Sequence, residues 1–496
     1  MRSLRRSRGV GVRRDCRGFC CRGAEAPGWG ACGPVPACAG TETFSGANLL
    51  HAQAGNRRLR PPAGGFSPTA SFALLSILLL TLLFALLRPA RAGNDGGFFL
   101  HDGDTVVFYG DSITEQQNYG RDIETYVLTR YPAWHVKFIN SGWTSDLVSG
   151  GKGGSADTRI KRDVLPYHPT VVTILLGMND GEYTHFKQSN YDAYTDGLTL
   201  LVDRLTKELP GVRVTLLSPT FYDESAPGSR HFRGYNDVLL KFRDFIKTLG
   251  GRRNILAVDL NAPLAEATRQ GRKRDPRFTL VPDGIHPNEA GQAIMAAAIL
   301  KAWNVQAEPT EITLDPASAA SATMLLPWPL PDKAAPAFAV SPLPGALDAF
   351  RVRAADLKSD RYDLLVDGQT VGTATRQELA AGLDLTRLPR LPQNRQAAQV
   401  REMVQSRLDA WRHLWNTGPD AIAHKGDAPS GAEVAALTAI DQWLDDRRDR
   451  ARDAAQPQTH TFSLRPAAPP LVATTEPSAR KHPVLSMHQT HRRPTR

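Results

Sequence analysis

The sequence DTVVFYGDSIT at residues 104–114 joins a run of strand-forming residues to a glycine, an acid and a serine. Residues Thr105–Tyr109 are continuously apolar or β-branched, which is typical of a parallel strand buried on both faces. Ser112 follows directly, so its hydroxyl is expected at the carboxyl end of the strand, where ligands bind in open α/β sheets. A helix predicted from about Tyr119 would leave free backbone N–H groups nearby, as a developing oxyanion requires.

Four further strand-like runs follow, and amphipathic stretches lie between or after them. The predicted strands are Val136–Asn140, Val171–Leu176, Val212–Ser218 and Ile255–Leu260. The predicted helices lie near 119–130, 191–208, 235–249 and 288–302. This alternation predicts a three-layer α/β/α domain with a parallel, flavodoxin-like sheet over residues 97–305.

A carboxylate and an imidazole stand in one tight turn far along the chain. Asp283 and His286 lie between Pro282 and Pro287, and Asn288 is a suitable helix N-cap. Asp283 could fix the imidazole while its other nitrogen acts as the base for Ser112. The alternative is that Asp283 only caps the helix and that His286 is a surface residue.

Two more strand ends carry polar residues. Asn179, in Gly177-Met178-Asn179-Asp180, has an amide that can donate to an oxyanion without carrying charge, although the same residues also suit a plain turn. Residues 140–146 read NSGWTSD and are followed by a glycine-rich run at 150–154. That run lacks the spacing of a phosphate-binding loop.

These blocks, GDSIT, NSGWTSD, GMND and DGIHPNEAG, occur in order on successive strand ends, and with them the chain resembles the GDSL/SGNH hydrolases. The resemblance covers residues 104–303 and implies Ser112 as nucleophile, His286 as base and Asp283 as its orienting partner. It implies an oxyanion hole made by Asn179 and the backbone N–H groups of Ser112 and Ser145. Ser145 stands where the family usually has glycine. The chain has no G-x-S-x-G, which argues against the α/β-hydrolase fold.

The formal net charge of +10 is concentrated at the two ends of the chain. Residues 1–70 carry +8 and residues 476–496 carry +4, which leaves −2 for residues 71–475. A nearly neutral body does not support binding to nucleic acid. All five cysteines also lie in residues 1–70, which we interpret as a disordered leader or as sequence translated from an over-early start.

A secretory signal peptide is predicted over residues 71–92. Residues 72–87 form a 16-residue apolar run with only two polar residues, a basic flank precedes it and Ala90-Arg91-Ala92 ends it. A membrane anchor is the alternative, but the run would reach only about 24 Å. We therefore expect a secreted or periplasmic protein with no stable membrane insertion after cleavage before Gly93.

The region after the hydrolase domain is predicted to contain three parts. Residues 306–347, which are rich in proline, are expected to form a linker or a strap along the first domain. Residues 348–460 are expected to form a small α+β region, with a hairpin turning at Asp367-Gly368, a capping box at Thr375 and two helices near 393–416 and 431–452. The charged face of the second helix is expected to be solvated, and residues 461–496 are expected to be a disordered tail.

The sequence and the resemblance together predict a secreted serine esterase that forms an acyl-enzyme and needs no metal or organic cofactor. Trp143, next to the oxyanion block, favours short acyl groups on a carbohydrate because an aromatic face can stack on a sugar, although Trp143 could instead be core. The alternative from another class is a cell-surface or periplasmic glycan-binding protein whose hydrolase domain is auxiliary or inactive. The sequence gives no indication of the oligomeric state.

Overall fold

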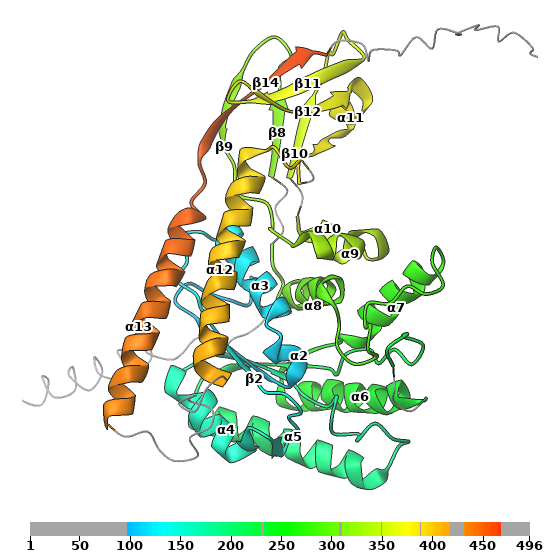
Figure 1. The fold of residues 1–496 in the computed structure, drawn as a ribbon, viewed down its shortest axis with the longest axis vertical. Coiled ribbons are helices and arrows are strands. Elements are labelled where there is room, and N and C mark those ends of the chain that lie inside the picture. The colour runs from blue at the N-terminus through cyan, green and yellow to red at the C-terminus, as the bar shows by residue number, and fades with distance from the viewer. Residues whose placement is uncertain are drawn as a thin grey trace, which may run out of the picture. The chain divides into compact units, whose positions relative to one another are not determined.

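The computed structural model describes residues 97–229, 233–306, 310–348, 350–386, 388–416 and 431–467 (Figure 1). The predicted leader, the predicted signal peptide and residues 468–496 of the predicted tail lie outside the described residues. None of the described helices combines the length and apolar character that crossing a membrane requires.

A five-stranded parallel sheet forms the centre of the first domain. Its strands are β1 (Thr105–Gly110), β2 (Lys137–Gly142), β5 (Val171–Leu175), β6 (Arg213–Leu217) and β7 (Leu256–Val258). Their order, β2-β1-β5-β6-β7, is the flavodoxin-like order, and every adjacent pair is parallel. All five residues of β5 are buried, as expected for the middle of a sheet covered on both faces. The predicted fold class is confirmed.

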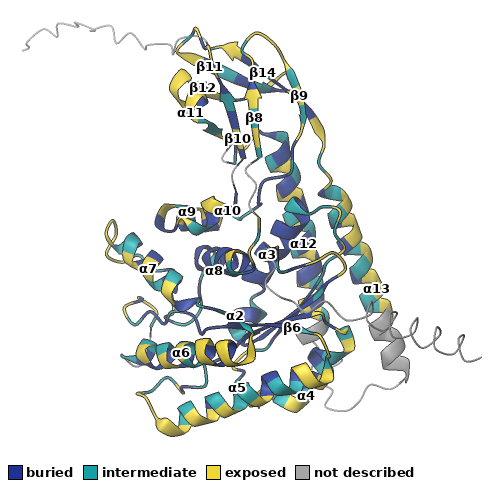
Figure 2. Cartoon of the chain, turned by 180° about the vertical axis from the view of Figure 1, so that it is seen from behind, coloured by how far each residue is buried: buried dark blue, intermediate teal, exposed yellow. Residues whose placement is uncertain are grey.

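Helices cover both faces of the sheet. One layer contains α3 (Asn118–Arg130), α7 (Asn261–Arg272) and α8 (Glu289–Ala302); the other contains α4 (Ala156–Asp163), α5 (Gln188–Glu208) and α6 (Tyr235–Arg253). Helix α8 is buried over almost its whole length, whereas α5 exposes one face (Figure 2). The sequence did not predict α4 and α7. Short elements complete the domain: α2 (Ser112–Glu115), β3 (Gly150–Gly151), β4 (Gly154–Ser155) and the 3-10 turn η1 (Leu165–Tyr167).

Two small sheets form a second core after the first domain. One has the order β13-β10-β8 and the other β12-β11-β14-β9. The strands are β8 (Thr310–Leu314), β9 (Ala320–Thr323), β10 (Phe350–Ala354), β11 (Arg361–Val366), β12 (Gln369–Thr375), β13 (Leu383–Asp384) and β14 (Thr459–Pro466). The predicted hairpin is β11–β12, and both of its turn residues, Asp367 and Gly368, have positive φ. The predicted capping box of Thr375 and Glu378 begins α11 (Arg376–Ala381).

The sequence-based boundaries of the linker and the tail were wrong. Residues 310–314 and 320–323 are strands rather than linker, and residues 461–466 belong to β14 rather than to a disordered tail. β8 pairs in parallel with β10, and β9 pairs with β14, which also pairs with β11. With these strands, the apolar side chains of the hairpin face a core of their own.

The rest of the predicted linker packs against the first domain. It contains the 3-10 turn η2 (Asp332–Ala334) and the helices α9 (Ala335–Val340) and α10 (Leu343–Leu347), all in contact with α8. Trp328 is buried, and its indole N–H donates to the backbone carbonyl of Asp122 in α3 at 2.8 Å. This segment therefore holds the region that follows it close to the first domain.

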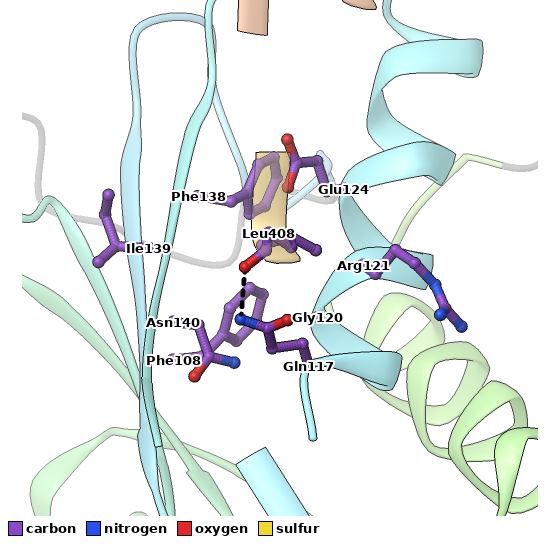
Figure 3. Close-up of a pocket in the computed structure, with 9 residues that line it drawn as sticks. All are labelled: Phe108, Gln117, Gly120, Arg121, Glu124, Phe138, Ile139, Asn140 and Leu408. Atoms are coloured by element: carbon purple, nitrogen blue, oxygen red, sulfur yellow. Dashed lines mark hydrogen bonds between the residues drawn. The ribbon is translucent and has the colours of Figure 1, made fainter. Parts of the chain in front are cut away.

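Two long helices, α12 (Pro392–Asn416) and α13 (Gly431–Ala454), pack against each other, and α12 also packs on α3. A cavity of about 10 Å³ lies at this contact. There the side-chain amide of Gln117 donates to the carbonyl of Leu408 (Figure 3). Arg407 of α12 pairs with the buried Glu124 of α3. Most of the charged run on α13 is solvated, as expected, but the Arg448 side chain is only 9% exposed.

Candidate active site

The nucleophile candidate lies at the edge of the sheet where the parallel strands end. Ser112 begins the single turn α2 directly after β1, and Asn179 follows β5, the neighbour of β1. Glycine is required at position 110, where β1 lies close to the end of β5, because a Cβ there would lie 2.7 Å from the carbonyl oxygen of Leu175. Gly177 has a φ of 118°, which lets the chain turn sharply before Asn179.

The three residues of the predicted triad form a chain of two hydrogen-bonding contacts, with His286 in the middle. Ser112 Oγ lies 2.8 Å from His286 Nε2, and His286 Nδ1 lies 2.7 Å from Asp283 Oδ2. The other oxygen of Asp283 accepts the backbone N–H groups of Ile285 and His286. Burial raises the pKa of Asp283, but these hydrogen bonds and the nearby imidazole outweigh it, so the pKa lies below the usual value. Asp283 is therefore a carboxylate at neutral pH. Asn288 is the N-cap of α8, as predicted.

The side chain of Asn179 is held in one orientation. Its Nδ2 donates to the backbone carbonyl of Asp146 at 3.0 Å, and its Oδ1 accepts the Tyr183 hydroxyl at 2.7 Å. Its second Nδ2 hydrogen is thereby left for another acceptor. Ser145 is exposed and has a φ of 59°, a left-handed conformation that explains why glycine usually stands at this position.

Comparison with known proteins follows this geometry. Residues 108–294 match the GDSL-like Lipase/Acylhydrolase family. Residues 108–294 therefore form a GDSL-like acylhydrolase domain. Since members of this family are acylhydrolases, the protein is an ester hydrolase.

Solved structures share the fold. A gut microbial diltiazem-metabolizing enzyme is 21% identical with a TM-score of 0.63, and the match covers 74% of this chain and 98% of that one. An acetylxylan esterase from Geobacillus stearothermophilus is 21% identical with a TM-score of 0.34, covering 42% of this chain and 97% of that one. No curated protein matches the chain. The first match spans about twice the length of the family match, so the similarity in fold extends beyond the hydrolase domain.

Trp143 of the GDSL-like hydrolase packs beside arginine side chains. Its ring is half-buried against the hydrophobic core, with the guanidinium groups of Arg159 and Arg162 at 6.0 and 5.4 Å from the ring centroid. A Cβ on Gly153 would lie 2.7 Å from the same ring. These neighbours explain the position of the Trp143 ring by packing alone. They therefore favour the alternative that Trp143 is part of the core and not a surface on which a sugar stacks.

A pocket of about 560 Å³ adjoins His286, the candidate base. Asp283 and His286 line one side of it, and the polar side chains Gln116, Asn118 and Glu289 line another. Lys333 of η2, from the segment that follows the hydrolase domain, also lines it. The volume lies in the usual range for ligand pockets, about 300–1,000 Å³.

Two buried acids lie behind the candidate site. Burial, together with neighbouring carboxylates, raises the pKa of Asp111 to about 8 and that of Asp180 to about 7. Asp111 Oδ1 accepts the backbone N–H of Ile113, while Asp180 Oδ1 accepts that of Val148. One oxygen of each has no partner among the described residues. Asp111 is therefore mostly protonated at neutral pH, and Asp180 is only partly ionised.

The stability of the hydrolase should fall as the pH rises through these values. A carboxyl whose pKa is raised on folding favours the folded state below its unfolded pKa, near 3.8 for Asp111, and loses this contribution as the pH approaches 8. The Asp111→Asn side chain cannot ionise. The free energy of unfolding of this variant, relative to that of the parent, should therefore rise between pH 5 and pH 8 and change little above pH 8. Urea unfolding at several pH values measures this difference. Asp196→Asn, on the exposed surface of α5, is the control. A difference independent of pH would contradict the prediction.

The sequence analysis missed two residues that support the site. Arg159 of α4 is fully buried, pairs with both Asp146 and Asp163, and donates to the Ser141 carbonyl at the end of β2. Tyr183 orients Asn179. Arg159 lies on a helix that the sequence did not predict, whereas the position of Tyr183, four residues after Asn179, was an available signal.

Proposed function

We propose that this ester hydrolase is a secreted serine esterase that cleaves short-acyl carboxylic esters through an acyl-enzyme. The observation that carries the proposal is the chain of contacts from Ser112 Oγ through His286 to Asp283, at 2.8 and 2.7 Å. The distances suit a nucleophile, its base and the group that orients the base. They favour a catalytically active hydrolase domain over the alternative, a glycan-binding protein whose hydrolase domain is auxiliary or inactive.

In the proposed first step, His286 Nε2 takes the hydroxyl proton as Ser112 Oγ forms a bond to the ester carbonyl carbon. The negative charge that develops on the carbonyl oxygen is stabilised by Asn179 Nδ2 and by the backbone N–H groups of Ser112 and Ser145. His286 then gives its proton to the leaving alcohol oxygen as the carbon–oxygen bond breaks. Water attacks the acyl-enzyme by the reverse sequence and releases the acid and the free serine.

Export is part of the proposal and rests on residues 71–92 alone. The apolar run with its basic flank and A-x-A end supports a cleaved secretory signal. An exported protein that begins at Gly93 is the corresponding expectation.

The proposal is tested with a series of p-nitrophenyl esters from acetate to palmitate. We expect kcat/KM to be highest for acetate or butyrate and to fall at least about tenfold by octanoate, because the residues NSGWTSD and the glycine-rich run at 150–154, beside the candidate oxyanion hole, offer a long alkyl chain little apolar surface to bury. Rates that rise steadily with chain length would contradict the short-acyl part of the proposal. No turnover of any ester by the folded protein would contradict the esterase function.

A further inference from the structure

The pocket beside His286 lies on the leaving-group side of the candidate triad. In the proposed mechanism, which this inference assumes, His286 hands its proton to the alcohol oxygen, so the alcohol part of the ester must sit next to the imidazole. The pocket of about 560 Å³ is lined by His286 itself. The oxyanion candidate Asn179 is not among its lining residues. The pocket is therefore placed to receive the alcohol and not the acyl group.

Two of the three carboxamides that line the pocket, Gln116 and Asn118, are held so that they present N–H donors. Gln292 Nε2 donates to the side-chain oxygen of Gln116 at 2.5 Å, while Gln292 Oε1 is occupied by the backbone N–H of Tyr119. Arg121 donates to the side-chain oxygen of Asn118 at 3.1 Å. Since both oxygens are used, the NH₂ groups of Gln116 and Asn118 are the parts that remain for a ligand.

Two further charged side chains of the pocket, Glu289 and Lys333, do not saturate each other. Glu289 is 25% exposed and Lys333 is 83% exposed, and their charged atoms lie 3.7 Å apart, beyond normal hydrogen-bond distance. Arg121 and Arg401 lie 3.9 and 3.7 Å from Glu289. Glu289 can therefore accept a ligand hydroxyl, and Lys333 can donate to one.

The charges around the pocket leave no excess of positive charge, which narrows the class of ligand. The cations Arg121, Arg401 and Lys333 stand against Glu289 and Asp283, which line the pocket, and against Asp122 and Asp332, which act electrostatically on Arg401. A site with several fixed donors and accepting carboxylates suits a ligand with several hydroxyl groups, each of which both donates and accepts. It offers no excess of positive charge to an anionic alcohol.

We propose that this pocket is an alcohol subsite that binds a sugar as the leaving group, with Glu289 and Lys333 as specificity-determining residues. The sugar oxygen that leaves Ser112 takes its proton from His286 Nε2, while neighbouring hydroxyls bond to Glu289, Lys333 and the two carboxamides. Lys333 lies beyond the hydrolase domain, so the following segment completes the substrate site. Carbohydrate specificity therefore comes from this pocket and not from Trp143.

The test compares two acetyl esters that differ only in the alcohol. One is p-nitrophenyl acetate, whose alcohol has no hydroxyl beyond the ester oxygen, and the other is a mono-O-acetylated methyl glucoside. Glu289→Gln and Lys333→Met are measured in the full chain, and Lys301→Met, at an exposed position in the last turn of α8, is the matched control. We expect each pocket variant to lower kcat/KM for the acetylated sugar at least about fivefold and to change that for p-nitrophenyl acetate less than twofold.

Each other outcome identifies the step that fails. Equal losses on both esters, or no loss on either, would overturn the sugar subsite. Turnover of p-nitrophenyl acetate with none of the acetylated sugar by the parent protein would overturn it as well, while leaving the esterase chemistry standing. A parent protein inactive on p-nitrophenyl acetate would instead contradict the proposed function.

Discussion

Replacing Ser112 by alanine is expected to lower the turnover of p-nitrophenyl acetate by about 10⁴-fold or more and to leave the fold intact. The variant removes the oxygen that lies 2.8 Å from His286, so no acyl-enzyme can form. What remains is catalysis by the oxyanion donors and by substrate binding, which falls far short of the complete triad. Initial rates at several substrate concentrations give the loss in kcat, and thermal unfolding tests the fold.

The control for this prediction is the same serine-to-alanine substitution at a position outside the site. Ser189→Ala, in the exposed first turn of α5, should retain the parent rate. A quenched reaction analysed by mass spectrometry should show an added acetyl group in the parent and none in Ser112→Ala. Parent-like turnover in Ser112→Ala would exclude this serine as the nucleophile.

The hydrolase domain could be predicted from sequence because its signals are local and strong. Five continuous apolar runs correspond to the five strands, and the polar residues directly after them lie at one edge of the sheet. Parallel topology then brings Ser112 and Asn179 together without further information. Helix α4 was missed because it is only eight residues long and strongly polar, and its one functional side chain, Arg159, is buried by tertiary contacts.

The second core was harder to predict because its strands are separated along the chain. β8 and β9 lie near a proline-rich stretch, and β14 follows a long charged helix, so each looks like a loop by itself. Only pairing with distant residues makes them strands: Thr310 of β8 pairs with Phe350 of β10, and Thr323 of β9 pairs with Thr459 of β14. A sequence periodicity of a few residues carries no information about such partners.

Parts of the candidate site depend on such long-range geometry too. The sequence could place Asp283 and His286 in one turn, and it could not show that Gln117, with a φ of 67°, donates to α12. Nor could it show that the Trp411 indole of the same helix donates to the carbonyl of Asn140, just before the oxyanion loop. Helix α12 thus contacts both the Gln117 side chain, which follows α2, and the backbone of β2 beside β1.

Glu124→Ala is expected to lower the free energy of unfolding by about 3–5 kcal/mol, the usual cost of removing one partner from a buried ion pair. Glu124 is buried between α3 and α12, and its carboxylate pairs with Arg407. Arg448 of α13 also faces it, and burial together with Arg407 lowers the pKa of Arg448 to about 10. Without Glu124, the buried guanidinium groups of Arg407 and Arg448 would lack their principal anionic partner and would repel each other.

Chemical unfolding of the full chain measures this loss, and Glu208→Ala, whose partner Arg204 lies with it on the surface of α5, should cost less than about 1 kcal/mol. The double variant Glu124→Leu with Arg407→Met should recover part of the lost stability, because it removes both charges and fills the space with apolar atoms. Since α12 also bonds Gln117 and Asn140, the single variant should lower kcat for p-nitrophenyl acetate more than the double variant does. A cost as small as that of Glu208→Ala would mean that α12 does not bury Glu124 against α3, and it would remove the structural reason for coupling these helices to Ser112.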